Sequence, residues 1–130
     1  MRHLDTNIVV AYLNGNEAIA AQLRSHLPEV AISSLVLAEL LYGTRASVRA
    51  EENIKRLEQF LQIVAVADFD QASAEAYSQI RLSLRQKGRP TGEIDALIAA
   101  IAVANNALLV THNTKHFENI DGLSLEDWLA

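Results

Sequence analysis

Residues 95–113 read DALIAAIAVANNALLVTHN, and this stretch decides which fold the chain adopts. Asp95 is followed by an unbroken apolar run from Ala96 to Ala104, which is typical of a buried helix. The next residues, Ala107 to Thr111, predict a short buried strand that ends in the polar corner Thr111-His112-Asn113. A buried helix that leads into a buried strand is the unit from which helix-covered parallel sheets are built.

The rest of the chain repeats this alternation of short apolar strands and longer helices. We predict further strands near 3–5, 30–32, 63–66 and 123–125, and helices near 17–27, 33–42, 49–61 and 70–87. Asp5-Thr6-Asn7 would cap one more helix after the first strand, and Gly43 would end the helix near 33–42. The predicted fold class is α/β, a three-layer α/β/α sandwich with a short, mostly parallel sheet. Its length fits a single domain over residues 1–130. Sites in such sheets form at the carboxyl ends of strands.

Composition excludes several classes of protein. The chain contains no cysteine, which excludes disulfides and thiolate-bound zinc. We expect a cytoplasmic protein without a membrane segment, because no signal peptide opens the sequence and the apolar run that ends at Ala104 is too short to span a bilayer. The net charge of −5 argues against general affinity for nucleic acid, although a charge sum ignores where the charges lie.

One basic stretch departs from this acidic balance. Residues 81–89 contain Arg81, Arg85, Lys87 and Arg89 and no acidic residue. A solvated helix end would explain them, because cations are favourable near the C-terminal end of a helix dipole. The alternative interpretation is a local phosphate-binding patch, and the sequence leaves both open.

Glu39 is the carboxylate with the least expected surroundings. It lies in LVLAELLY, residues 35–42, where its neighbours are apolar or nearly so. A helix that is apolar all round is normally buried, and a buried carboxylate is costly unless it is paired or bound to a metal. We therefore expect Glu39 to be buried and functional. A narrow solvated stripe, or a pair with Arg45, would also explain it.

Two further carboxylates stand at predicted helix starts. Asp5 and Asp95 each have a capping explanation that requires no chemistry, whereas Glu93 is expected to be exposed. Together with Glu39 they form a set at the edge where strand ends and helix starts converge. Such carboxylates repel one another without a cation, and a hard divalent ion with oxygen ligands resolves that conflict. The set therefore predicts a metal site.

The sequence resembles the PIN-domain ribonucleases of the VapC toxin group over nearly its whole length. The order and spacing of the matching segments carry the resemblance, and those segments are Leu4–Ile8, Ile32–Ser34, Ala38–Gly43, Gly88–Pro90, Gly92–Asp95, Leu97–Ala100, Leu109–Thr114, Phe117, Gly122–Leu123 and Asp127–Trp128. A PIN-like fold and a single nuclease domain are what the resemblance implies.

The resemblance also implies an activity, a cofactor and a partner. It implies a Mg²⁺- or Mn²⁺-dependent endoribonuclease, usually dimeric, restrained by a VapB antitoxin, with initiator tRNA cut in the anticodon loop as the suggested substrate. Asp5 and Asp95 would bind the ion, and Glu39 would bind it through water or help to deprotonate the nucleophile. A fourth acidic position of the family holds Asn113 here. We assign substrate positioning to Thr6, Asn7, Thr111 and Asn113.

Two other interpretations and one partner contact complete these expectations. A degenerate PIN domain that binds RNA or a partner without cleaving it would explain Asn113, and a metal-dependent phosphatase on a similar sheet is a third possibility. The segment Asp5-Thr6-Asn7 lacks the second aspartate that a phosphoaspartate-forming phosphatase carries. We also expect the antitoxin to insert a basic side chain near Asp5 and Asp95, because arginine binds carboxylates bidentately.

Overall fold

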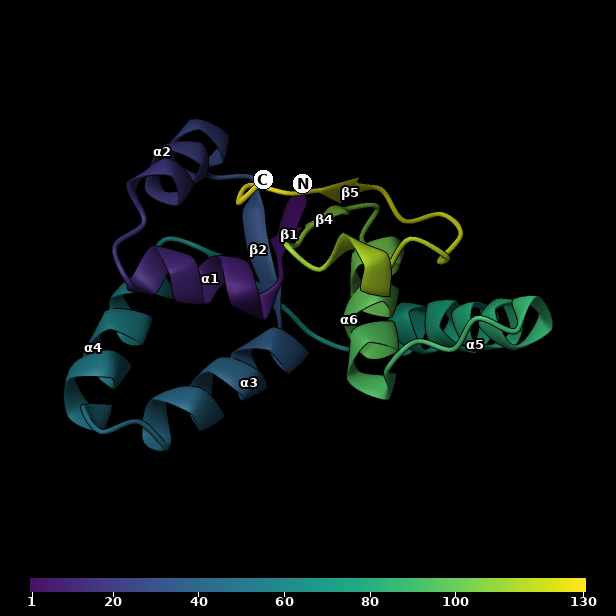
Figure 1. Cartoon of the computed structure of the whole chain (residues 1–130), viewed down its shortest axis with the longest axis horizontal. Helices are drawn as coiled ribbons and strands as arrows, with labels where there is room; N and C mark the ends of the chain where they lie inside the picture. Colours follow the sequence, from purple (N-terminus) through teal and green to yellow (C-terminus); the bar gives the residue numbers. More distant parts are fainter.

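The computed structural model describes all 130 residues and contains a five-stranded sheet flanked by helices (Figure 1). Every neighbouring pair of strands is parallel, and the order is β3-β2-β1-β4-β5. The strands are β1 (Arg2–Leu4), β2 (Val30–Ser33), β3 (Ala65–Ala67), β4 (Leu108–Val110) and β5 (Leu125–Glu126). The helices are α1 (Thr6–Leu13), α2 (Glu17–His26), α3 (Ser34–Arg45), α4 (Ala50–Phe60), α5 (Gln71–Lys87) and α6 (Glu93–Ala104), with a 3₁₀ turn, η1 (Thr114–His116). The predicted α/β class is confirmed.

The strand order places the site. β1 lies at the centre of the sheet, with β2 on one side and β4 on the other. The chain continues from β1 to β2 and β3 on one side and later adds β4 on the other side, so the strand order reverses between β1 and β4. The backbone N–H of Asp5, just after β1, donates to the carbonyl of Val110 at the end of β4 (2.8 Å). Ligands of open α/β sheets bind outside such a reversal of strand order.

Side-chain caps explain why the helices begin where they do. Asp5, Asn16, Ser33 and Asp70 each precede a helix, and each side chain accepts a hydrogen bond from a backbone N–H of the first turn. These bonds satisfy donors that a helix start otherwise leaves unpaired. Gly88 ends α5 in the left-handed conformation (φ +64°), which glycine adopts without a steric penalty.

Two predicted helix limits are wrong. Gly43 does not end α3, which continues to Arg45; a single internal glycine costs only about 1 kcal/mol, and α3 is held by the buried side chains of Val36 and Leu40. Helix α6 begins at Glu93 rather than Asp95, because Gly92 takes the position before the helix. Asp95 therefore lies within the first turn and does not cap the helix.

The first strand is shifted by one residue, to Arg2–Leu4 instead of 3–5, and the limits of the two edge strands differ most from the prediction. β3 covers Ala65–Ala67 instead of 63–66, and β5 covers Leu125–Glu126 instead of 123–125. Both strands lie at the edges of the sheet. An edge strand is set by its pairing with one neighbour, here β2 and β4, and its own apolar pattern is a weak guide to its limits.

Helix α6, which contains the apolar run from Ala96 to Ala104, lies at the centre of the core. α6 buries Ala96, Ile98 and the whole run from Ala99 to Ala102, and it packs against α5 and α3. The alanines allow neighbouring helices to approach closely, while Ile98 and Ile101 fill space in the core. No helix in the molecule combines the length and the apolar character that a membrane crossing requires.

His3 is a buried titratable group on the central strand. Its side chain is 2 % exposed, and its Nδ1 has no hydrogen-bond partner. Burial, together with the charge of the N-terminal amine, lowers the pKa of His3 from 6.5 to about 4. The imidazole is therefore neutral in the folded protein at neutral pH, since protonation would leave a poorly solvated charge in the core.

We predict that stability falls as the pH drops from about 6.5 to about 4. In that interval the unfolded chain binds a proton at His3 that the folded chain does not, so the free energy of unfolding loses up to about 3 kcal/mol. Chemical denaturation at several pH values of the wild type and of His3→Leu measures this. The variant should show a shallower pH dependence, and equal slopes would contradict the assignment.

Candidate active site

Asp5 is the most firmly held carboxylate of the site. It follows β1, is only 6 % exposed, and caps α1. Its Oδ1 accepts from the backbone N–H of Thr6 (2.9 Å), and its Oδ2 accepts from the Thr111 hydroxyl (2.7 Å), which is fully buried after β4. A buried carboxylate needs such donors to offset its lost hydration. The expected cap is present, and it fixes the carboxylate at the crevice.

Glu39 reaches the same site through a hydroxyl. The Thr6 Oγ1 donates to Glu39 Oε1 at 2.6 Å, so Thr6 contacts Asp5 through its backbone and Glu39 through its side chain. The expectation that Glu39 is buried is wrong: it is exposed on the outer side of α3, together with Ala38 and Tyr42. An apolar composition did not bury this face of the helix. Glu39 forms no pair with Arg45, since its partner is Thr6.

Asp95 carries the perturbed charge of the site. It lies in the first turn of α6, half-buried, and a Cβ on Gly92 would stand 3.5 Å from its Oδ2. Burial raises the pKa of the Asp95 carboxyl, and the charge of Asp5 raises it further. His116 opposes both effects, with its Nδ1 3.3 Å from Asp95 Oδ2. Asp5 and Asp95 are therefore close enough to repel each other.

The polar corner after β4 is tied to α1 and to the C-terminal segment. The backbone N–H of His112 donates to Asn7 Oδ1 (3.2 Å), and the N–H of Asn113 donates to the Thr111 hydroxyl (3.1 Å). The His112 ring lies 3.1 Å from Asp127 Oδ2. Asn7 and Thr111 thus hold the backbone of the corner, while the Asn113 side chain is exposed at its tip.

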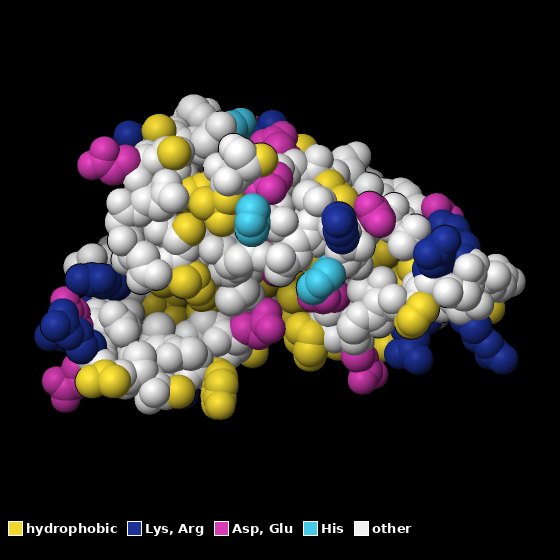
Figure 2. Space-filling model, in the orientation of Figure 1, with side chains coloured by type: hydrophobic (Ala, Val, Ile, Leu, Met, Phe, Trp, Pro, Cys, Tyr) yellow, Lys and Arg dark blue, Asp and Glu magenta, His cyan; other side chains and the backbone are white.

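The donor atoms fit a hard cation, although they do not enclose one. No three acidic or histidine side chains converge closely enough to hold an ion. Asp5 and Asp95 nevertheless present carboxylate oxygens whose mutual repulsion a divalent cation would relieve, and oxygen donors are what Mg²⁺ and Mn²⁺ prefer. Glu39 is linked to Asp5 through Thr6, whose hydroxyl donates to Glu39 and whose backbone N–H donates to Asp5. Figure 2 shows acidic side chains over the facing parts of α3 and α6.

One site residue was missed by the sequence. It is His116, which is exposed like His112, and the ring of each of these histidines contacts a carboxylate. The signal was its place in the loop after β4, at the same sheet edge as Asp95. Glu93 is exposed as expected, and it pairs with Arg81 rather than joining the site.

Comparison with known proteins shows which family the sequence matches. The sequence matches the PIN domain family over residues 3–123. It is 41 % identical to Ribonuclease VapC2 of Rickettsia felis, with 96 % of each chain covered. It is 37 % identical to a tRNA(fMet)-specific endonuclease VapC of Shigella flexneri, again with 96 % of each chain covered.

A solved structure has the same fold. The crystal structure of VapBC2 from Rickettsia felis, bound to a DNA fragment from their promoter, superposes on this chain with a TM-score of 0.92. The two sequences are 40 % identical, and the alignment covers 98 % of each chain.

The repulsion between Asp5 and Asp95 gives a prediction that requires no substrate. Asp5→Asn should lower the pKa of the Asp95 carboxyl, because it removes the neighbouring negative charge, whereas His116→Gln should raise it. The measurement is a ¹³C NMR titration of the aspartate side chains in metal-free protein. Asp68→Asn, an exposed aspartate before α5, is the control and should change nothing. An unchanged Asp95 titration in Asp5→Asn would show that the two carboxylates do not interact.

Proposed function

The chain belongs to the PIN-domain family and is homologous to the VapC ribonucleases, and from that premise we propose that it is a Mg²⁺- or Mn²⁺-dependent endoribonuclease that hydrolyses RNA phosphodiesters. The observation that carries the proposal is the pairing of Asp5 with Asp95 at the switch point of the sheet. Two carboxylates held this close are unfavourable in the free protein, and a cation relieves the strain.

Asp5 and Asp95 are the residues that would hold the ion. When bound, a divalent ion lowers the pKa of a water molecule and stabilises the negative charge that develops on the phosphate. Asp5 is oriented by its bonds to Thr6 and Thr111. Asp95 lies 3.3 Å from the His116 ring, so the cation would compete with His116 for this carboxylate.

Glu39 has a separate role in this proposal. Its exposed carboxylate accepts the Thr6 hydroxyl and is free to accept a further bond from water. It would contact the ion through water or take the proton of the attacking water. Of the four residues expected to position the substrate, Thr6 and Asn113 would contact it or its water, and Asn113 offers an exposed amide where the family often carries another acid. Thr111 is fully buried and Asn7 accepts from the His112 N–H, so these two would act indirectly by holding Asp5 and the corner after β4.

The substrate we propose is initiator tRNA, cut in the anticodon loop. The support is the Shigella flexneri relative, described as tRNA(fMet)-specific. Sequence-specific RNA recognition generally targets single-stranded loops with splayed bases, and an anticodon loop offers such a segment. The single domain over residues 1–130 holds every residue to which this mechanism assigns a role.

We predict that Asp5→Asn or Asp95→Asn lowers cleavage more than about 100-fold while the fold is retained, because each removes an ionic ligand. Asp68→Asn is the control, with the same change of charge outside the site. A transcriptome-wide map of RNA ends after brief induction should show breaks in the initiator tRNA anticodon loop for the wild type and the control alone. Full activity of either site variant would refute the mechanism, and breaks elsewhere would refute the substrate.

A VapB-type antitoxin is the proposed partner, and a homodimer the proposed assembly. A hollow of about 320 Å³ lies beside the site, lined by Thr6 and Glu39 and by the apolar side chains of Val10, Leu13 and Leu40. Figure 2 shows it as an apolar recess below α1. Such a hollow suits a partner segment whose apolar side chains fill it while an arginine reaches the carboxylates. Tyr42, 78 % exposed on α3, supports a face that assembly covers.

We predict that replacing that antitoxin arginine with alanine weakens the complex by at least about 2 kcal/mol, since it leaves the acidic pair without a counter-charge. Titration calorimetry of the toxin with each antitoxin measures the loss, and an antitoxin lysine or arginine outside the contact serves as the control. Added Mn²⁺ should weaken the wild-type complex by competition. Inhibition that survives replacement of every antitoxin arginine would exclude this contact.

A further inference from the structure

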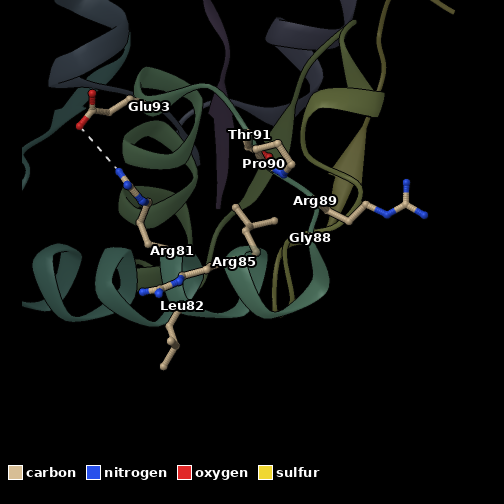
Figure 3. Close-up of a pocket in the computed structure, with 9 residues that line it drawn as sticks. Arg81, Leu82, Arg85, Gly88, Arg89, Pro90, Thr91 and Glu93 are labelled. Atoms are coloured by element: carbon tan, nitrogen blue, oxygen red, sulfur yellow. Dashed lines mark ion pairs between the residues drawn. The ribbon is translucent and has the colours of Figure 1, made fainter.

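A second concave surface lies beside the active site. A groove of about 780 Å³ runs between the C-terminal half of α5, the following loop and the start of α6. Its charged lining residues are Arg81, Arg85, Arg89 and Glu93 (Figure 3). Figure 2 shows Lys and Arg side chains gathered over this end of α5. A protein with a net charge of −5 has therefore concentrated positive charge in one groove.

The arginines of the groove are not neutralised within the protein. Arg81 contacts the Tyr77 hydroxyl (2.7 Å) and lies 3.8 Å from Glu93, an exposed and weak pair. Arg85 has no acidic partner within ion-pair distance. Arg81 and Arg85 stand four residues apart on α5, an arrangement of like charges that destabilises a helix. An anion placed between them would remove that cost.

The helix dipole does not explain Arg81, although Arg85 lies in the last turn of α5, where a cation is favourable. Lys87, in the last turn of α5, has its own partners, with Nζ 2.7 Å from Asp121 Oδ1 and 2.9 Å from the Asn119 carbonyl, and it does not line the groove. Arg81 lies well before the last turn, where the dipole has little effect. In Figure 3 the guanidinium of Arg85 points to the same side as Arg81, whereas Arg89 points away from both.

The groove is connected to the site by short steps. Glu93 and Asp95 share the first turn of α6. The Thr91 hydroxyl, at the edge of the groove, donates to the carbonyl of His116 (3.2 Å), and the His116 ring contacts Asp95 (3.3 Å). A chain whose phosphate lies at Asp5 and Asp95 would therefore pass next to Arg81.

We propose that Arg81 and Arg85 bind backbone phosphates of single-stranded RNA next to the cleaved position, and that Glu93 occupies Arg81 until RNA displaces it. This inference rests on the proposed ribonuclease function and adds the path of the substrate. Arginine suits the role because its planar fork binds phosphate bidentately. Of the basic residues in 81–89, Lys87 is excluded from it, and Arg89 is assigned no contact.

The test is binding of a fluorescent single-stranded RNA to Asp5→Asn protein, which does not cleave it, measured by anisotropy at several salt concentrations. Arg81→Gln and Arg85→Gln should each weaken binding and reduce the slope of log K against log salt by about 0.7, the value for one phosphate contact. Lys87→Gln, with the same loss of charge on the same helix, should leave the slope unchanged. Glu93→Gln should tighten binding more than Glu75→Gln, an exposed acid elsewhere on α5.

The outcomes separate this inference from the function on which it rests. One outcome is that Arg81→Gln and Arg85→Gln give the same salt slope as Lys87→Gln, while the protein that retains Asp5 cleaves RNA. This outcome would overturn the groove as the RNA path and leave the ribonuclease function standing. Absence of both RNA binding and cleavage would overturn both. An equal loss for all three basic variants would indicate general charge attraction and would also overturn the assignment.

Discussion

The hydrogen bond from the Thr111 hydroxyl to Asp5 Oδ2 is the contact on which the site depends. It joins the ends of β1 and β4, which are far apart in the sequence and adjacent in the sheet. Both partners are buried, and the hydrogen bonds from Thr6 and Thr111 offset the hydration that the carboxylate loses there. Loss of either donor would leave a buried charge poorly solvated at the point where the fold brings its functional residues together.

Around this bond, side chains of like charge lie close enough to repel one another. Asp95 is held near Asp5 by the start of α6, and the repulsion is partly balanced by His116. Glu39 is kept at one remove, through Thr6. Farther along α6 and α5, Arg81 and Arg85 repel each other in the same way with the opposite sign. Each arrangement is unfavourable in the free protein, and each is relieved by a component of the proposed reaction, a cation at the acids and phosphate at the arginines.

The features that local sequence patterns predict wrongly have a common physical origin. The apolar surroundings of Glu39 pointed to burial, yet α3 leaves one apolar face uncovered, and composition does not report which face a neighbouring element covers. The limits of β3 and β5 were missed because edge strands take theirs from a partner. The proximity of His116 to Asp95 was not predicted, because it depends on the path of the loop after β4.

The sequence by itself determined the local features. It contained the alternation of strands and helices, the caps at Asp5, Ser33 and Asp70, and the buried helix α6, because periodicity and capping act within a few residues. Tertiary contacts place β4 beside β1, bring Asp95 near enough to Asp5 for its charge to raise the Asp95 pKa, and let Arg85 line a groove while Lys87 contacts Asp121. Those facts depend on contacts between distant segments, and local sequence patterns do not encode which distant segments meet.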